Sequence, residues 1–217
     1  MTESWPDIRA TYDAVAQEYA AAFADELDAK PFDRALLEEF AAACPGRVFD
    51  VGCGAAGHVT RYLADRGADV TGIDLSSASI DIARARQPEL RFEVADMRQL
   101  PCGDGELTGL VAFYSVIHLP REQVPVALAE FRRVLRTGGV LLVSMHGGMG
   151  EIQDDRWFGR PVSVRATLWS LPDLMAAIQE AGFVVRRHVG RDPYPAEHRT
   201  QRLYVWAEAG RAECELN

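Results

Sequence analysis

The chain has 217 residues, 48% of them hydrophobic and 25% charged, so one domain can bury a large core without a disulfide or metal staple. The formal net charge of −9 disfavours nucleic acid and anionic membrane surfaces as partners. The first residues do not resemble a secretory signal, no apolar run is long enough for a membrane span, and the four cysteines lack CxxC spacing. We therefore expect residues 1–217 to form a single cytoplasmic domain without a metal, monomeric or homodimeric.

Strand-like and helix-like segments alternate after a helical N-terminal region. Helical spacing of apolar residues predicts helices over residues 8–23 and 32–43, so residues 1–44 are expected to form a helical cap. Further along, strands are predicted over residues 47–51, 69–73, 91–95, 107–114 and 140–145, and helices over residues 58–66, 77–86 and 121–136. This alternation is typical of a Rossmann-like α/β sandwich with a parallel sheet between two helix layers.

The last third of the chain departs from this alternation. A helix over residues 171–181 is followed by two strands, 183–189 and 201–208, with too few residues between them for a crossover helix. We expect them to complete a seven-stranded, mostly parallel sheet whose last strand is antiparallel. Residues 147–170 contain glycines, a proline and two tryptophans, and are predicted to form a loop or lid over the carboxyl ends of the strands.

A GxGxxG motif, residues 52–57, lies between the first strand of the alternating region and the next helix. Glycines there allow a tight turn and let a ligand approach the backbone. The motif alone is a weak signal that also fits an NAD-dependent dehydrogenase. Asp50 favours a different ligand, because a carboxylate would repel a pyrophosphate and would attract a cation. A turn or N-cap carboxylate is the structural alternative for Asp50.

Two more carboxylates end the next two strands. Asp74 follows the glycine turn by about 20 residues, where a carboxylate can accept hydrogen bonds from ribose hydroxyls. Asp96 ends the third strand, where it can accept from the amino group of an adenine while Met97 packs on the ring. Helix capping by Asp74 and a turn role for Asp96 are the structural alternatives. Three carboxylates at successive strand ends beside one glycine turn indicate a nucleoside site with a cationic group.

These motifs resemble class I S-adenosylmethionine (SAM)-dependent methyltransferases of the group that modifies small molecules. The resemblance covers residues 8–208 and is carried by FDVGCGAAGHVTRYLADRGADVTGIDLS, VADMRQLP, FYSVIHLP and EFRRVLRTGGVLLVSM, with YDAVAQEYA resembling the helix that caps the cofactor. His58 departs from the small or threonine-like residue that is usual there, so its role stays open. The resemblance implies that SAM is the cofactor and that S-adenosylhomocysteine is the product.

Carried over by position, the resemblance implies a set of cofactor-binding residues. Asp50 would hold the methionyl ammonium directly or through water, and Tyr114 would offer backbone contacts to the methionyl group. Tyr19 would close over the cofactor, with a core position as its alternative. The full set comprises Tyr19, Asp50, Gly52, Cys53, Gly54, Asp74, Leu75, Asp96, Met97 and Tyr114.

Methyl transfer needs alignment of donor and acceptor, and a hydroxyl acceptor also benefits from a general base. His118 after the fourth strand and His146 at the end of the fifth are candidates for that base, because histidine titrates near neutral pH. We expect O- or N-methylation of a small molecule. A protein acceptor, an NAD-dependent oxidoreductase and a SAM-binding protein without catalysis are the alternatives. The residues Phe113-Tyr114-Ser115-Val116 disfavour base methylation of nucleic acid, which typically uses an Asn/Asp-Pro-Pro-Tyr turn.

Overall fold

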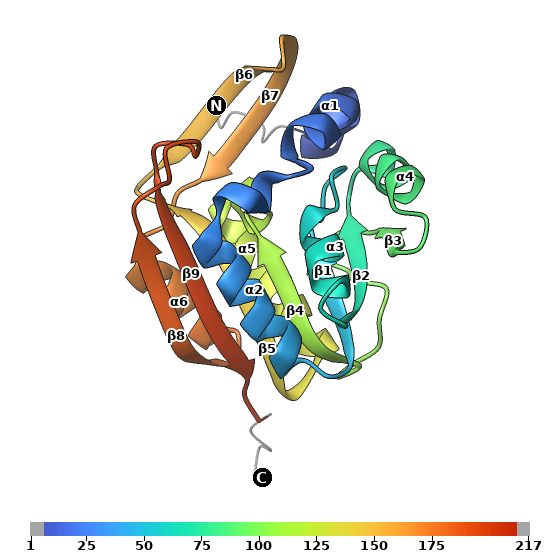
Figure 1. Ribbon diagram of the computed structural model, residues 1–217. Helices are drawn as coiled ribbons and strands as arrows, with labels where there is room; N and C mark the ends of the chain where they lie inside the picture. The colour runs from blue at the N-terminus through green and yellow to red at the C-terminus, as the bar shows by residue number, and fades with distance from the viewer. Residues whose placement is uncertain (1–6, 212–217) are drawn as a thin grey trace.

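The computed structural model describes residues 7–211, and a seven-stranded sheet runs through its centre (Figure 1). The strand order is β3-β2-β1-β4-β5-β9-β8, parallel from β3 to β5, with β9 antiparallel to both of its neighbours. The predicted seven-stranded sheet with an antiparallel last strand is therefore confirmed. The bounds are β1 (Arg47–Val51), β2 (Asp69–Asp74), β3 (Arg91–Val94), β4 (Leu107–Phe113), β5 (Leu135–Gly147), β8 (Phe183–Arg191) and β9 (Gln201–Ala209).

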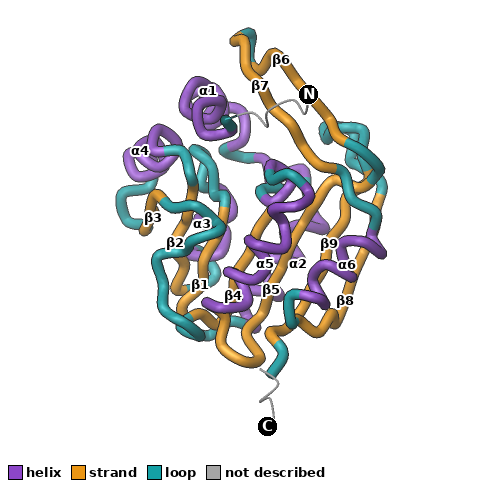
Figure 2. Tube along the Cα trace, turned by 180° about the vertical axis from the view of Figure 1, so that it is seen from behind, coloured by secondary structure: helices purple, strands orange, loops and turns teal. Residues whose placement is uncertain are grey.

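Helices cover both faces of the sheet, as the alternating pattern predicts. Alternate residues of β1 point to opposite faces: Val48 packs with the helices α2 and α3, whereas Phe49 and Val51 pack with α5 and α6. Figure 2 shows α5 and α6 together on the face turned away from the viewer in Figure 1. The bounds are α1 (Ile8–Phe23), α2 (Pro31–Ala43), α3 (His58–Ala64), α4 (Ser77–Arg86), α5 (Val124–Val134) and α6 (Leu171–Glu180).

The N-terminal segment is helical, with α1, the short 3-10 helix η1 (Glu26–Ala29) and α2 following one another before β1. The predicted cap also included residues 1–6, which lie outside the described residues. Asp7 starts α1 by accepting hydrogen bonds from the backbone N–H groups of Arg9 and Ala10. Helix α1 packs against α4 and against the strand β7 (Arg160–Thr167), above the carboxyl ends of the sheet strands.

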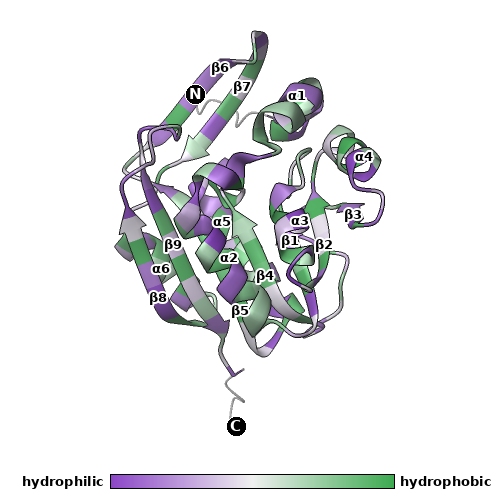
Figure 3. Ribbon diagram, viewed as in Figure 1, coloured by the Kyte–Doolittle hydropathy of each residue, from purple (hydrophilic) through white to green (hydrophobic). Residues whose placement is uncertain are grey.

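The segment 147–170 is not the loop that we expected. It forms an antiparallel β-hairpin of β6 (Glu151–Trp157) and β7 (Arg160–Thr167), which extends beyond the end of the main sheet toward α1 (Figure 1). Most of β6 is exposed, and Figure 3 shows hydrophilic residues along it. Because an exposed two-stranded ribbon lacks the apolar alternation of a half-buried strand, the hydropathy pattern did not reveal it. Its predicted role as a lid stays a prediction.

The boundary between α5 and β5 also differs from the expectation. The helix was predicted to run to Arg136 and the strand to begin at Val140, with Gly138-Gly139 as a break between them. The helix ends at Val134 instead, and β5 begins directly with Leu135. The glycine pair lies inside the strand, where the pairing register with β4 shifts. A glycine pair can therefore mark a strand irregularity as well as a helix end.

Candidate functional site

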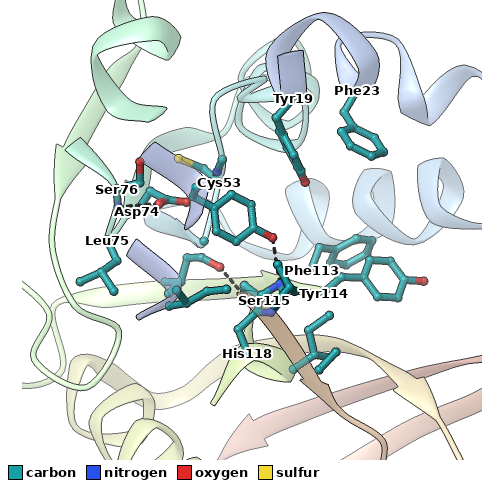
Figure 4. Close-up of a pocket in the computed structure, with 18 of the residues that line it drawn as sticks. Tyr19, Phe23, Cys53, Asp74, Leu75, Ser76, Phe113, Tyr114, Ser115 and His118 are labelled. Atoms are coloured by element: carbon teal, nitrogen blue, oxygen red, sulfur yellow. Dashed lines mark hydrogen bonds between the residues drawn. The ribbon is translucent and has the colours of Figure 1, made fainter. Parts of the chain in front are cut away.

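A cavity of about 820 Å³ opens at the carboxyl ends of the parallel strands, beneath α1 and the β6–β7 hairpin. Its wall combines the turn after β1, the ends of β2, β4 and β5, the helix α1, and parts of the hairpin and of the β8–β9 loop. Figure 4 shows Asp74, Leu75, Ser115 and His118 on this wall, with Tyr19 entering from α1. The ends of β1, β2, β4 and β5 are those that the sequence motifs indicated, whereas no motif indicated the β8–β9 loop.

The glycine turn after β1 brings bare backbone to the cavity. Gly52 and Gly54 have φ angles of +79° and +63°, which favour glycine. A Cβ on Gly52 would lie 2.1 Å from Cβ of Ser115, and one on Gly54 would lie 3.2 Å from Cε1 of Tyr19. The backbone N–H groups of Gly52 and Cys53 donate to the carbonyl of Ile73, at 2.7 and 3.0 Å. The turn is thus pinned to β2, and only glycine fits at its narrowest point.

Asp74 is positioned at the end of β2 to accept further hydrogen bonds. Its Oδ2 accepts from the backbone N–H of Gly54 at 2.9 Å, and its Oδ1 accepts from that of Ser76 at 2.8 Å. The N-cap of α4 is Ser76, whose hydroxyl accepts from the N–H of Ser79, so Asp74 does not serve as that cap. A carboxylate has about four acceptor positions, which leaves capacity for ligand hydroxyls. Leu75 beside it lines the same cavity.

Asp50 is buried on the cavity wall at the end of β1. Its Oδ2 accepts a hydrogen bond of 2.6 Å from the Thr60 hydroxyl on α3. Burial raises the pKa of Asp50 to about 6, although the Thr60 hydrogen bond and the nearby His58 lower it. A cationic ligand group would therefore replace lost hydration and favour the ionised form. His58 lines the cavity nearby and lies 3.2 Å from Glu26, measured from Nε2 to Oε2.

Asp96 and Met97 follow β3 and line the cavity. Asp96 is paired with Arg98, whose Nε lies 2.9 Å from Oδ1, and the hydrogen bond from Arg98 lowers the pKa of the carboxyl. The Asp96 carboxylate therefore stays ionised at neutral pH, and both of its oxygens accept from Arg98. Contact of Asp96 and Met97 with an adenine stays a prediction.

Tyr114 follows β4 in a left-handed conformation that is costly for a residue with a side chain, with φ of +51°. Its backbone N–H donates to the carbonyl and the hydroxyl of Ser144, both at 3.1 Å. Its own hydroxyl lies 2.7 Å from that of Tyr204, which donates to Asp33. The side chain is thus tied to β9 and α2, and Tyr114 lines the cavity.

A buried charge network at this end of the cavity was missed by the sequence analysis. Glu197, in the β8–β9 loop, lies 2.7 Å from Arg191 and 3.4 Å from both Lys30 and Arg202. Burial raises the pKa of Glu197, but these three cations and the N–H of Tyr194 outweigh it and lower the pKa to about 2. No local sequence pattern predicts such a network, because its members come from the residue before α2, from β8 and β9, and from the loop between these two strands.

The two candidate histidines differ in how their rings are held. The Nδ1 of His118 lies 3.0 Å from the carbonyl oxygen of Arg165, and its Nε2 lies 2.8 Å from the Tyr12 hydroxyl. The Nδ1 of His146 accepts from the guanidinium of Arg202, which can only donate, so the ring proton of neutral His146 is on Nε2. Burial lowers the pKa of His118 to about 4, and burial with Arg202 lowers that of His146 to about 3. Both rings are therefore neutral near pH 7.

Aromatic side chains form the roof of the cavity. Tyr12 meets Trp157 edge to face with ring centroids 5.7 Å apart, and Phe23 meets Phe158 at 6.4 Å. The Thr11 hydroxyl donates to a carbonyl of β7 at 2.9 Å, which fastens α1 to the hairpin. Trp157 and Phe158 thus line the cavity. Trp169 is instead buried in the core.

No helix of the described residues is long and apolar enough to cross a membrane. Residues 7–211 also hold no group of three or more histidine, cysteine, aspartate or glutamate side chains that could bind a metal ion. The cavity instead offers bare backbone at Gly52 and Gly54, and carboxylates at Asp50 and Asp74. These groups fit a nucleoside that carries an amino-acid cation, as SAM does.

Comparisons with known proteins agree with this chemistry. Residues 48–139 match a family model described as a methyltransferase domain. The chain is 36% identical over 116 residues to malonyl-[acyl-carrier protein] O-methyltransferase of Serratia marcescens, a match that covers 52% of this chain and only 44% of that enzyme. It is 30% identical over 169 residues to an uncharacterised methyltransferase of Synechocystis, covering 73% of this chain and 76% of that protein.

Solved structures share the fold at lower sequence identity. The 1,6-didemethyltoxoflavin-N1-methyltransferase of Burkholderia thailandensis, solved with its substrate and S-adenosylhomocysteine, has a TM-score of 0.70 at 21% identity, covering 94% of this chain and 87% of that one. A SAM-dependent methyltransferase of Methanosarcina mazei has a TM-score of 0.69 at 17% identity, covering 76% and 92%. The family match, the Synechocystis relative and the geometry of the glycine turn agree, and the chain belongs to the class I SAM-dependent methyltransferases.

Proposed function

We propose that this methyltransferase transfers the methyl group of SAM to a hydroxyl or amine of a small, flat molecule held under the aromatic roof. The observation that carries the proposal is the continuity of one 820 Å³ cavity, from the glycine turn and Asp74 to Tyr12, Trp157 and Phe158. Such a cavity has the size and the mostly apolar walls of a small-molecule site. The net charge of −9 supports a small molecule over nucleic acid.

Two relatives support an acceptor of this class. The O-methyltransferase cnsE of Penicillium expansum is 30% identical over 145 residues. The Burkholderia neighbour is an N1-methyltransferase of the small molecule 1,6-didemethyltoxoflavin. SAM supplies a methyl group that is already activated by the positive charge on sulfur. The protein then has to align the acceptor, exclude water and accept a proton, and the neutral His118 is our candidate for the last task.

In our proposal, the cofactor lies along the wall built from β1, β2 and β4. Asp50 holds the methionyl ammonium, while Gly52, Cys53 and Gly54 lie against the methionyl group together with the backbone at Tyr114. Asp74 and Leu75 hold the ribose, and Asp96 and Met97 hold the adenine. Tyr19 covers the cofactor from above, because its ring lies against the glycine turn.

Calorimetric titration tests the cofactor first. We expect SAM and S-adenosylhomocysteine to bind with micromolar affinity, and NADH and NADPH not to bind. Asp74→Ala should weaken binding of the adenosyl compounds at least roughly tenfold, since two ribose hydrogen bonds are lost. Binding of NADH without any response to SAM would overturn the assignment.

The acceptor is then tested by measuring the formation of S-adenosylhomocysteine from SAM in the presence of candidate acceptors. Phenols and anilines are the first candidates. Turnover of a phenol or an aniline supports a flat hydroxyl or amine acceptor. Turnover of protein substrates alone, with none of the small molecules accepted, would contradict the proposal while leaving the cofactor assignment intact.

A further inference from the structure

The hydrogen bonds of Tyr12 and His118 fix the direction in which a proton can move. The Nδ1 of His118 lies 3.0 Å from the Arg165 carbonyl oxygen, which can only accept. In the neutral ring the proton is therefore on Nδ1, and Nε2 is an acceptor. The Tyr12 hydroxyl, 2.8 Å from Nε2, must then be the donor of that hydrogen bond. The Tyr12 hydroxyl thus donates its only proton to the hydrogen bond with the imidazole.

The oxygen of Tyr12, a residue that lines the cavity, is left with acceptor capacity. A hydroxyl has one proton and two lone pairs. Because the Tyr12 hydroxyl donates its proton in the hydrogen bond to His118, its oxygen can only accept a hydrogen bond from a ligand. The ring of Tyr12 stands 5.5 Å from that of Tyr19 and 5.7 Å from that of Trp157, between centroids. Tyr19 faces the glycine turn and Trp157 belongs to the aromatic roof. Tyr12 therefore lies where the cofactor wall and the acceptor wall meet.

We propose that Tyr12 is a catalytic residue that takes the proton from the attacking O–H or N–H of the acceptor and passes its own phenolic proton to Nε2 of His118. This inference rests on the proposed methyl transfer to a small molecule, and it adds a residue that the sequence analysis did not select. The acceptor is accordingly a hydrogen-bond donor at its attacked atom.

The relay balances atoms and charge. A lone pair of the acceptor oxygen or nitrogen forms the new bond to the methyl carbon, and the pair of the broken carbon–sulfur bond stays on sulfur. The acceptor proton moves to the Tyr12 oxygen, and the phenolic proton of Tyr12 moves to Nε2 of His118. The imidazolium then keeps its Nδ1–H on Arg165. The positive charge on sulfur disappears and a positive charge appears on the His118 ring. The net charge of the enclosed site is therefore unchanged, and no additional charge has to be desolvated.

The environment of the pair favours this concerted transfer over a free phenolate. Burial raises the pKa of the Tyr12 hydroxyl, and the negative charges of Asp74 and Glu26 raise it further. A phenolate is therefore disfavoured, and Tyr12 ends the transfer as neutral as it began. The Nδ1 of His146 is occupied by Arg202 and by the Thr200 hydroxyl, and its Nε2 carries the ring proton. His146 therefore has no free acceptor nitrogen and takes no part in the relay.

The hydrogen-bond arrangement can be tested without methyl transfer. Long-range ¹H–¹⁵N spectra of the full chain with labelled histidine are compared for the wild type, Tyr12→Phe and Tyr62→Phe. Tyr62 is the matched control, because its hydroxyl donates to the Arg34 carbonyl away from the cavity. We expect His118 to be the neutral Nδ1–H tautomer, and its Nε2 resonance to move downfield in Tyr12→Phe alone. A protonated Nε2 in the wild type, or no shift in Tyr12→Phe, would overturn the relay.

Turnover of two phenols separates proton transfer from binding. Phenol itself is protonated at mildly alkaline pH, whereas 4-nitrophenol is largely ionised and has no proton to give. We expect Tyr12→Phe to lower kcat for phenol roughly 10²-fold or more and kcat for 4-nitrophenol less than about tenfold, with SAM affinity unchanged. Adding His118→Gln to Tyr12→Phe should cause little further loss, because the two residues act as a unit.

If Tyr12→Phe lowered kcat equally for phenol and 4-nitrophenol, Tyr12 would have a binding role and the relay would be contradicted. Failure of the wild type to methylate either phenol would also count against it, since the relay requires a hydroxyl or amine under the roof. If SAM still binds in the calorimeter in that case, the methyltransferase assignment stands and only the acceptor chemistry fails. If SAM does not bind, the proposed function itself has failed.

Discussion

Asp50 shows how a single buried carboxylate can reduce the stability of the free protein. It is buried with one hydroxyl partner, and burial raises its pKa from 3.8 to about 6. The folded protein thus holds this proton more tightly than the unfolded chain does. The resulting stabilisation is present below about pH 4 and is lost as the pH rises through about 6. At neutral pH, the ionised Asp50 is therefore a destabilising residue until a cation arrives.

This balance predicts the effect of Asp50→Asn, which removes the charge and keeps the shape. The free energy of unfolding of the variant minus that of the wild type should be larger at about pH 8 than at about pH 4, by up to roughly 3 kcal/mol. Its affinity for SAM should fall, because the methionyl ammonium loses its carboxylate. Urea unfolding at the two pH values and calorimetry measure the two effects. The same stability difference at both pH values would contradict the pKa argument.

At the scale of elements, the turn between β1 and α3 was predictable because its requirement is local. The apolar run of β1 and the glycines that follow it fix the position of the turn, and the structure confirms their left-handed conformations. The β6–β7 hairpin was not predictable in the same way. Most residues of β6 are exposed to solvent, so the hydropathy of this strand does not differ from that of a loop. What fastens the hairpin is contact with α1, some 150 residues away in the chain.

The turn also yields a prediction with an internal control. Gly52 and Gly67 have similar φ angles, +79° and +83°, but a Cβ on Gly52 would strike Ser115 whereas nothing lies within 4 Å of one on Gly67. Gly67→Ala should cost only the backbone strain, about 1 kcal/mol of unfolding free energy. Gly52→Ala should cost at least about 2 kcal/mol more and abolish SAM binding. Chemical denaturation and calorimetry would show this, and equal costs at the two sites would refute the steric account.

At the scale of the whole molecule, the sheet order and the cofactor wall followed from the sequence, whereas the rest of the cavity did not. The wall of Gly52, Asp74 and Asp96 follows from strand ends that meet at one edge of a parallel sheet. The network around Glu197 joins residues more than 150 positions apart, Lys30 among them. Only the completed antiparallel pairing of β5 with β9 places Arg202 opposite His146. Such long-range neighbours are not encoded in any local spacing.

Cofactor binding should stabilise the whole fold, since the wall draws on elements across the sheet. At a free S-adenosylhomocysteine concentration of 100 times its Kd, linkage gives about 2.7 kcal/mol of added stability. For a chain of this size, that corresponds to a rise in Tm of roughly 5–10 °C. Differential scanning fluorimetry should show this rise in the wild type and lose most of it in Asp74→Ala. An unchanged Tm in the wild type would mean that the ligand does not bind.

The two walls of the cavity come from different parts of the chain, which bears on how such enzymes diverge. Asp50, Asp74, Asp96 and Tyr114 lie within residues 48–139, the stretch that matches the methyltransferase domain model. The roof and the far end come from α1, from the hairpin and from β9, all outside that stretch. We therefore expect substitutions in the flanking segments, apart from those at Tyr19 on α1, to change what is methylated and to leave the proposed donor site intact. After gene duplication, one copy can therefore acquire a new acceptor and keep the same cofactor site.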